Sequence, residues 1–525
     1  MANPFDSLRS LRVNAEQSRS TKKYLPIVIL LLLMIPSIWF LLLPGFFESD
    51  DGEWMVIRFS AFYQAFVDGQ FPVRFLGRLN HGFGYPVANF LYPGFMYFAV
   101  PFHVLGLNFV DTVKAVLVFS IVATAVFSYF WLSKIFDRLS AIAGVVVITY
   151  TPYHLFDLYK RGSVGELFAF VWVAFILWMI ETKNIFFISM GIFLLAIAHN
   201  TIFLLFSPLL FLYSLIRKTI SFRETLVSFI LGILMSSFFT IPAIYELQFT
   251  NFAATKISNL SEYFVNFGLI GFSTFLILAL SLFVFLKDRK KNNLFFLFFF
   301  ISVLSIFFSL NISEPIWKVL PSNLIQFPFR LLSYLIFSVG FLTAFAIYKL
   351  SKQRIIITVI IITLLIFSAY EYAIPAKRVF RDDSFYFTNE ATTTVQDEYM
   401  PKWVKKKPDA RYKNKVEMVE GSGEIKNLSY NDSKKISFDI EAATTSRIRI
   451  NTIYYPGWEA KINGQRTIIS YSNDSGVMEI AVPNGLSEVE FIFRETSVRL
   501  GADVVSVFAF ALLVFYQKKS LKRLW

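Results

Sequence analysis

The sequence contains no cysteine and only four histidines in 525 residues, so disulfides, thiolate nucleophiles and zinc–thiolate sites are excluded. Charge is scarce as well, because only 17% of the residues are charged while 55% are hydrophobic. Several apolar runs exceed the ~18–20 residues that span a bilayer. The composition therefore excludes a soluble protein and predicts a polytopic membrane protein.

Motifs that bind nucleotide phosphates are also missing. The chain has neither a Walker-type loop nor a G-x-G-x-x-G sequence that opens a soluble α/β domain, so a nucleotide-activated substrate is not indicated. The net charge of +13 is an excess of the kind found in nucleic-acid-binding proteins. In a membrane protein, however, it fits cytoplasmic loops that face anionic lipid. We expect membrane lipid as a partner and no nucleic acid.

Basic clusters follow the apolar runs and indicate the topology. They lie at Lys22-Lys23, Lys134, Lys183, Arg217-Lys218, Lys287, Lys349 and Lys518-Lys519. If all of them face the cytoplasm, the chain has about twelve spans in the plasma membrane, with both termini inside. The moderately apolar segment 91–107, which contains Pro93 and Pro101, then does not cross. We expect it to be a juxtamembrane or re-entrant element.

Composition divides the chain into four parts. We expect a basic cytoplasmic N-terminus (1–24), a transmembrane domain (25–374) with its first external loop at 47–110, an extracytoplasmic β domain (375–499), and a last span with a basic tail (500–525). Residues 375–499 alternate between apolar and polar with the period of strands. Asn463-Gly464 predicts a hairpin, and Pro483-Asn484-Gly485 predicts another turn. Trp458 is expected to pack internally. The predicted fold is mainly α, with juxtamembrane helices and a small antiparallel β domain.

An acidic cluster follows the first apolar run directly. Glu48, Asp50, Asp51 and Glu53 lie just after residues 25–47. Charge beside the membrane is unfavourable unless it is solvated, paired or used, so the cluster indicates either a solvated helix end or a catalytic base or metal ligand. Asp51 and Arg58 share a face of the predicted helix. They form either a weak surface ion pair or a base beside a cation that binds phosphate.

The motifs of the first loop resemble those of a known membrane family. They are Asp51-Gly52 with Arg58, Asp68-Gly69-Gln70-Phe71-Pro72 with Arg74, Gly82-Phe83-Gly84-Tyr85-Pro86, Asn89, and Tyr92-Pro93. This series resembles the bacterial and archaeal family labelled "6-pyruvoyl-tetrahydropterin synthase-related", which is similar to YfhO-like proteins and belongs to the glycosyltransferase C superfamily. Later segments fit the same pattern, and the ordered set covers most of the chain. These segments are residues 152–162 with Glu166, 198–201, 326–330 and 455–464.

The resemblance implies a transfer reaction. The donor would be a polyprenyl-phosphate sugar, and the acceptor an extracytoplasmic glycan, lipid or protein. A carboxylate would take the proton of the acceptor hydroxyl in an inverting displacement, and arginines would hold the departing lipid phosphate. We expect Asp51 as the base, with Asp50 and Glu53 as alternatives. The predicted donor-binding residues are Arg58, Arg74, Asn89, Tyr92, Tyr159, Arg161, Glu166, His199, Asn200 and Arg330.

Cofactor, activity and function each have alternatives. No metal site is required, although Asp50 and Asp51 are candidate ligands for magnesium or manganese. Met55 stands where the resembled family is expected to have histidine, so the chain is either an active enzyme or a degenerate scaffold that binds surface glycan. A transporter or flippase of lipid-linked glycan would need charges within its spans. The nearly uncharged runs 268–286, 294–310 and 355–368 favour an enzyme over a transporter.

Overall fold

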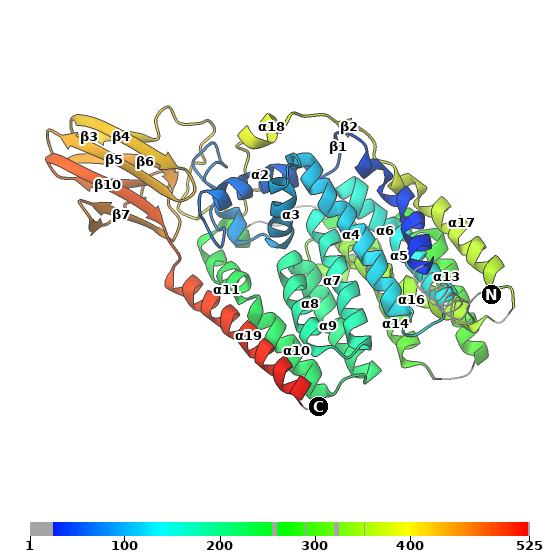
Figure 1. Cartoon of the computed structure of the whole chain (residues 1–525). Helices are drawn as coiled ribbons and strands as arrows, with labels where there is room; N and C mark the ends of the chain where they lie inside the picture. Colours follow the sequence, from blue (N-terminus) through cyan, green and yellow to red (C-terminus); the bar gives the residue numbers. More distant parts are fainter. Residues whose placement is uncertain (1–24, 255–259, 289–290, 320–324, 351, 523–525) are drawn as a thin grey trace, which may run out of the picture.

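The computed structural model describes residues 25–254, 260–288, 291–319, 325–350 and 352–522. Most of these residues form helices, and a small β domain stands at one end of the helical bundle (Figure 1). The predicted fold class is therefore confirmed, namely a mainly helical chain with membrane-length helices and a small antiparallel sheet domain. The predicted basic N-terminus 1–24 and the last three residues of the tail lie outside the described residues.

Seven helices in the described ranges are long and apolar enough to cross a membrane. They are Leu25–Leu42, Phe109–Leu132 (α4), Val164–Glu181 (α7), Asn200–Arg217 (α9), Pro328–Lys349 (η8 and α16), Arg354–Ala373 (α17) and Ser497–Gln517 within Ser497–Lys522 (α19). Counting each of four bent pairs as one crossing gives up to eleven. The predicted number of about twelve would need a shorter apolar helix as well, such as Ile185–Ala198 (α8), whose 14 residues fall short of the ~20 that a crossing needs.

The four bent pairs interrupt their spans at short breaks. They are Arg138–Tyr150 (α5) with Pro152–Arg161 (α6 and η2), Phe222–Met235 (α10) with Ser237–Phe249 (α11 and η3), Leu260–Ile270 (η5 and α12) with Phe272–Asp288 (α13), and Asn293–Ser309 (α14) with Asn311–Trp317 (η6 and α15). Their bends range from 44° to 82°. The break at Gly271 requires glycine, because φ is +83° and a Cβ there would lie 2.7 Å from the Pro152 ring.

Short elements cover the end of the bundle nearest the β domain, and we call them the cap layer (Figure 1). They are Phe46–Phe47 (β1), Gly52–Val67 (α2), Pro86–Asn89 (η1), Gly94–Val104 (α3), Arg378–Val379 (β2) and Asp383–Thr388 (α18). β1 pairs antiparallel with β2, which joins the first loop to the segment that follows α17. α3 has only 11 residues, fewer than the ~20 that a crossing needs.

The β domain consists of two antiparallel sheets. The first has the order Gly423–Asn431 (β4), Lys435–Ala442 (β5), Gly485–Phe493 (β10), Trp458–Ile462 (β7), Gln465–Thr467 (β8), and the second has the order Val416–Glu420 (β3), Ser446–Ile453 (β6), Val477–Val482 (β9). The predicted alternation holds, because the apolar positions of β5, β6 and β10 are buried. These positions are Ile436, Phe438, Ile440, Ile448, Ile450, Val489, Phe491 and Phe493.

The two predicted turns have different roles. Asn463 and Gly464 join β7 to β8 in a two-residue hairpin, and both have the positive φ that a type I′ turn requires. Pro483-Asn484-Gly485 does form a turn, but it links β9 and β10, which lie in different sheets. A turn motif therefore predicts a reversal of direction without deciding which strands pair.

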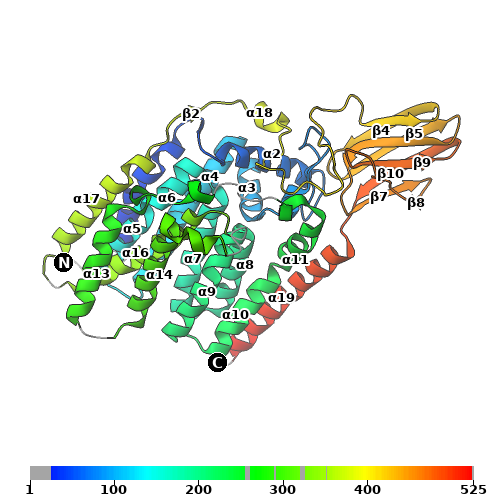
Figure 2. The same cartoon turned by 180° about the vertical axis from the view of Figure 1, so that it is seen from behind.

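The β domain packs against the first loop and the last helix. The ring of Trp458 is buried, as expected, and packs edge-on against Phe493 of its own domain and Phe75 of the first loop. α19 continues from β10 and lies beside α10 and α11 along one flank of the bundle (Figure 2). Residues 380–415 carry no strand and run across the cap layer before β3 begins.

Candidate functional site

Two buried clusters of charged and polar side chains lie where the cap layer meets the helices, and they divide the predicted site residues between them. The Glu166 cluster contains Tyr92, Asp157, Arg161, Glu166, His199 and Arg330. The Glu246 cluster contains Asn89, Glu246, Tyr455 and Arg499. Both are almost inaccessible to solvent.

Glu166 is the centre of the first cluster and is 0% exposed, in the first turn of α7. Its Oε1 accepts hydrogen bonds from Arg161 Nη1 and from Arg330 Nε, each at 2.7 Å. Arg161 Nη1 also donates to Asp157 Oδ1 at 2.6 Å. Buried ions are tolerated when they are paired in this way, and charge-assisted bonds are the stronger kind. Nη2 of both arginines hydrogen-bonds none of the described residues.

The start of α2 sits directly on this cluster. The backbone N–H groups of Asp50 and Asp51 donate to the carbonyls of Lys160 and Arg161, at 2.9 and 2.8 Å. The π-helical turn η2, residues Asp157–Arg161, ends at Gly162, whose φ is +66°. A Cβ on Gly162 would lie 2.8 Å from the backbone of Gly52, so glycine is what permits this approach.

Asp51 occupies the N-cap position of α2, but its side chain makes no capping hydrogen bond. It is half-buried, and its carboxylate pairs with none of the described residues. A carboxylate that is positioned but not engaged is what a general base requires. The neighbouring Asp50 remains accessible. Partial desolvation, and then the charge of Asp51, raise the pKa of Asp50, while Arg161 opposes them.

Tyr92 connects the cap layer to the cluster. Its ring lies 4.4 Å from the ring of His199, and a Cβ on Gly165 would come within 2.0 Å of it. Burial raises the pKa of Tyr92 to about 12, with Arg58 opposing and Asp51 adding to the effect. The hydroxyl therefore stays protonated. Tyr92 thus lies within electrostatic reach of both Asp51 and Arg58.

Arg58 is buried in α2 without a carboxylate partner among the described residues. Its Nη2 donates to the Thr393 carbonyl at 2.6 Å, and its Nε donates to Thr393 Oγ1 at 3.3 Å. The third nitrogen, Nη1, donates to the Met55 sulfur at 3.1 Å. Met55, where the resembled family is expected to have histidine, is therefore a buried neighbour of Arg58, which has no anionic partner among the described residues.

His199 and Asn200 hold the turn between α8 and α9. His199 Nδ1 accepts from the Ile202 N–H at 3.3 Å and so caps α9, while its Nε2 lies 3.9 Å from Glu166. Asn200 donates to the Phe90 carbonyl at 3.2 Å. These residues tie the helices to the cap layer, and only His199 reaches the Glu166 cluster.

The structure places four further predicted residues, in addition to Asn200, away from the Glu166 cluster. Glu53 accepts a hydrogen bond from Tyr386, and Tyr159 donates to the Ser37 carbonyl of the first helix. Arg74 pairs with Glu495 and Asp503, and Asn89 donates to Glu246 at the end of α11.

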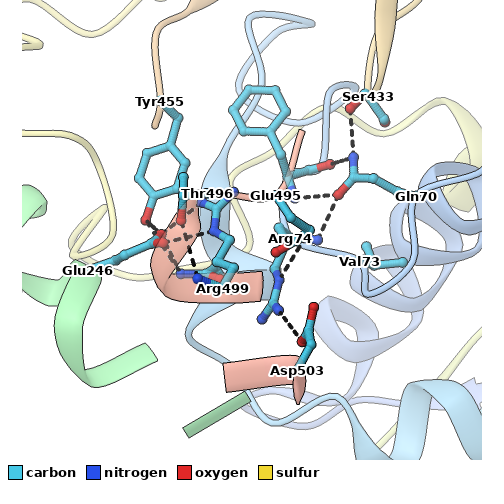
Figure 3. Close-up of polar contacts among 12 residues, drawn as sticks. Gln70, Val73, Arg74, Glu246, Ser433, Tyr455, Glu495, Thr496, Arg499 and Asp503 are labelled. Atoms are coloured by element: carbon cyan, nitrogen blue, oxygen red, sulfur yellow. Dashed lines mark hydrogen bonds and ion pairs between the residues drawn. The ribbon is translucent and has the colours of Figure 1, made fainter. Parts of the chain in front are cut away.

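The Glu246 cluster closes the junction of four segments. Glu246, at the end of α11, accepts a bidentate pair from Arg499, with both distances 2.8 Å. Tyr455 and Asn89 donate to its Oε2 at 2.7 and 2.9 Å. Figure 3 shows Tyr455, Glu246 and Arg499 pointing toward one another. Glu246 and Arg499 were not among the residues predicted from the sequence. Each is an ionisable residue at the end of an apolar helix, and this position is the sequence feature that could have identified them.

Arg74 belongs to a neighbouring ion-pair group that reaches the last helix. Its Nε lies 3.3 Å from Glu495 and its Nη2 lies 3.5 Å from Asp503 (Figure 3). Gln70 fixes the loop around it, because its Oε1 accepts from the backbone N–H of Arg74 and its Nε2 donates to the Ser433 carbonyl. These contacts attach the first loop to α19 and the β domain.

Metal ligands are few in this region. In the described ranges, no group of three or more histidine, aspartate or glutamate side chains is placed to hold a metal ion. Asp50 and Asp51 supply two carboxylates, so magnesium or manganese bound there would need further oxygen ligands from substrate or water.

Comparison with known proteins adds a limited likeness. No protein-family model and no curated protein matches this chain. Among solved structures, the chain is similar to the archaeal oligosaccharyltransferase AglB from Archaeoglobus fulgidus, determined in complex with an inhibitory peptide and a dolichol-phosphate. The identity is 12% and the TM-score is 0.39, over 71% of this chain and 57% of that chain. A likeness of this size carries no argument about function, which must come from the chain's own residues.

Proposed function

We propose that this chain is a membrane glycosyltransferase that moves a sugar from a polyprenyl-phosphate-linked donor to an extracytoplasmic glycan, lipid or protein acceptor. The observation that carries the proposal is the unengaged carboxylate of Asp51, which sits on a buried cluster of arginines at the end of membrane-length helices. A base and an anion-binding group side by side are what a transfer from a lipid phosphate needs.

The arginines suit the phosphate of the donor. Arg161 and Arg330 each keep Nη2 free of described partners, and Arg58 has no carboxylate partner among the described residues. A guanidinium presents several N–H groups in a planar fork that matches a phosphate. The cluster lies at helix ends, where a phosphate at headgroup level can enter while its lipid tail stays in the bilayer. Low solvent access strengthens the attraction.

The reaction that fits this arrangement is a single displacement. The acceptor hydroxyl oxygen attacks the anomeric carbon while Asp51 takes the hydroxyl proton. The bond between the anomeric carbon and the phosphate oxygen breaks, and the lipid phosphate leaves with the bonding electrons. Its growing negative charge is stabilised by Arg161 and Arg330. The transition state has oxocarbenium character, and the configuration at the anomeric carbon is inverted.

Charge placement favours an enzyme over a transporter of lipid-linked glycan. Arg161 ends η2, Glu166 lies in the first turn of α7, and Arg330 lies in η8 at the start of its span. A transport pathway would carry such groups deeper within the helices. A degenerate scaffold is the remaining alternative, and Met55 against Arg58 is the observation that favours it.

The test is sugar transfer by the purified chain in nanodiscs with extracted lipid-linked sugars, measured as product and as released polyprenyl phosphate. Asp51→Asn keeps the shape and removes the base, so turnover should fall by about 10²-fold or more. Glu48→Gln is the matched control, because Glu48 belongs to the same acidic cluster and is exposed. Its turnover should equal that of the wild type.

Three outcomes separate the possibilities. Near wild-type turnover in Asp51→Asn would move the base to Asp50 or Glu53, which Asp50→Asn and Glu53→Gln would then identify. Normal turnover in the variant that combines Asp50→Asn, Asp51→Asn and Glu53→Gln would contradict the mechanism. If the wild-type chain neither transfers sugar nor releases lipid phosphate from any extracted donor, the scaffold alternative is favoured.

Topology has its own test, because a chain without cysteine reports introduced cysteines without background. We propose that the cap layer and β domain are extracytoplasmic and that both termini are cytoplasmic. Tyr430→Cys and Asp409→Cys should react with an impermeant maleimide on intact cells. Lys134→Cys and Lys218→Cys should react only after lysis. The opposite pattern would reverse the proposed orientation.

A further inference from the structure

A pocket of about 450 Å³ opens where the first loop, the β domain and the last helix meet. This volume lies within the ~300–1,000 Å³ that is usual for small-molecule sites. Its walls come from residues 69–72, from the β domain, and from the chain that joins β10 to α19. Gln70 and Glu495, which contact Arg74, are among the lining residues (Figure 3). The pocket shares no residue with the Glu166 cluster, so the transfer reaction does not explain it.

Two arginines line this pocket and share one carboxylate. Arg466 Nη2, in β8, lies 3.1 Å from Glu459 Oε1, and Arg494 Nε, just after β10, lies 3.7 Å from Glu459 Oε2. Neither arginine pairs with another carboxylate in the described ranges. Their side chains are 74% and 53% exposed, so both are open to a ligand. One positive charge therefore remains uncompensated at an accessible place in the pocket.

The other charged residues of the walls are balanced by their neighbours. Glu495 lies 3.3 Å from the buried Arg74. Lys434 donates a hydrogen bond from Nζ to the Gly69 carbonyl, and its charge interacts with that of Asp68, which does not line the pocket. The excess charge thus belongs to the arginine pair. Guanidinium groups match a phosphate with their planar forks, and an ammonium group can add a further donor. The polar part of the pocket therefore suits a phosphate.

Apolar side chains complete the pocket and continue along α19. Phe71 and Leu500 line the pocket, and both are exposed. Val504 and Val507 follow Leu500 at helical spacing and are also exposed, so the three share one face of the membrane-length segment Ser497–Gln517. An exposed apolar face is ordinary on a membrane helix. A face that begins in a basic pocket is what a ligand with a charged end and an apolar end needs.

We propose that this pocket binds the headgroup of an anionic glycerophospholipid, whose acyl chains lie along the apolar face of α19. The pocket lies at the start of a membrane-length helix, which places it at the level of lipid headgroups in either orientation of the chain. A water-soluble anion would leave Phe71 and Leu500 without contacts, and a zwitterionic lipid would leave the positive charge without a partner. The inference does not depend on the proposed transferase function.

A lipid bound in this way would connect three segments that are distant in sequence. It would contact the first loop through Phe71, the β domain through Arg466, and the last helix through Leu500. The phosphate would then hold the β domain beside the first loop at the membrane surface. The expected role of the site is therefore to attach the β domain to the bilayer.

The experiment measures lipid selectivity beside the pocket in the purified full chain. Because the chain has no cysteine, Ser497→Cys gives a single site for a bimane fluorophore at the exposed start of α19. The labelled chain is placed in phosphatidylcholine nanodiscs with increasing fractions of doxyl-labelled phosphatidylglycerol or doxyl-labelled phosphatidylcholine as the quencher. Half-maximal quenching should need about 5-fold less phosphatidylglycerol than phosphatidylcholine, since a basic residue near an anionic lipid contributes about this factor.

Two variants and a control test the arginine pair. The double variant Arg466→Gln with Arg494→Gln should lose the selectivity, so that both lipids quench alike. Arg466→Gln alone should reduce it. Melting temperatures should stay at the wild-type value, because both side chains are exposed. Arg447→Gln is the matched control, because Arg447 is an exposed arginine of the β domain that pairs with Glu420 outside the pocket. It should keep the wild-type selectivity.

Three results would overturn the proposal. The first is equal quenching by the two lipids in the wild-type chain, and the second is selectivity that survives in the double variant. The third concerns glycerol 1-phosphate, which carries the same phosphate without acyl chains and should not restore the fluorescence at millimolar concentration. If it does, the pocket binds a water-borne phosphate, and the assignment to a lipid is wrong.

Discussion

Glu166 and Glu246 are both buried carboxylates paired with arginine, yet they are arranged differently. Glu246 receives a bidentate fork from Arg499 and two neutral donors, and it joins the first loop, α11, the β domain and α19. Glu166 receives one bond from each of two arginines, Arg161 and Arg330, and a third from the Tyr153 hydroxyl at 3.2 Å, while Nη2 of both arginines hydrogen-bonds none of the described residues. The backbone N–H of Asp51 donates to the carbonyl of Arg161, a partner of Glu166, so the unengaged carboxylate of Asp51 belongs to the edge of the Glu166 cluster.

The difference teaches how one ion-pair chemistry supports two roles. A carboxylate whose acceptor positions are filled by a fork and two further donors fixes its segments in place and leaves no position for a ligand. A carboxylate that shares its charge between two arginines positions their remaining N–H groups for a second anion. We therefore expect changes at Glu246 to affect stability and changes around Glu166 to affect activity.

The largest effect is expected for Glu246→Ala. It leaves the Arg499 guanidinium buried without its anionic partner, and breaking a buried pair in this way costs about 3–5 kcal/mol. The measurement is the free energy of unfolding in mixed micelles, followed by tryptophan fluorescence. Glu488→Ala is the control, because Glu488 is exposed, and its change should stay within about 0.5 kcal/mol. An equally small change in the free energy of unfolding of Glu246→Ala would contradict the structural role assigned to Glu246.

A pair of arginine-to-lysine changes sharpens the contrast. Arg330→Lys replaces a planar fork with a point charge, so donor turnover should fall by about 10-fold, and stability should fall as well because the bonds to Ile325 and Gln326 are lost. Arg499→Lys loses one bond of a bidentate pair, so stability should fall by about 1.5–3 kcal/mol while the turnover of the remaining folded protein is kept. Turnover and melting are measured on the same preparations. If Arg330→Lys lowered only stability, the two clusters would not differ in role.

The smallest effect concerns Asp50 at the edge of the Glu166 cluster. Because the pKa of Asp50 is raised above its ordinary 3.8 in the folded chain, folding favours the protonated form, and stability falls as pH rises above 3.8. Asp50→Asn should therefore melt slightly above the wild type at neutral pH, and the difference should vanish below pH 3.8. Melting curves across this range give the answer. A variant that melts lower at neutral pH would show that the charge of Asp50 is stabilising.

Much of the fold could be read from local patterns, whereas the breaks within it could not. Long apolar runs gave the membrane class, and alternation with Asn463-Gly464 gave the β domain and its hairpin. The number of crossings does not follow from the apolar runs alone, because α8 is short and four spans bend. A hydropathy pattern records that a run is apolar but not where packing interrupts it. Gly271, for example, is required by the nearby Pro152, which is distant in sequence.

The candidate site shows the same division. Arg161 and Glu166 are five residues apart, so their proximity follows from one turn between two helices. Arg330 joins them from 164 residues away, and Arg58 bonds Thr393 across 335 residues. Residues that shared the same sequence signals were placed elsewhere, as Arg74 and Asn89 show. The sequence motifs predicted which polar residues lie near the cap layer. They did not predict which of the two clusters each residue joins.

The sequence by itself determined the class of this protein, because the transfer of apolar residues out of water and the period of two along a strand are local properties. Only the tertiary structure decided which charges meet. Arg499 and Glu246 pair across 253 residues, and Arg58 donates to Thr393 across 335. Such contacts depend on how whole elements pack, and no single segment carries that information.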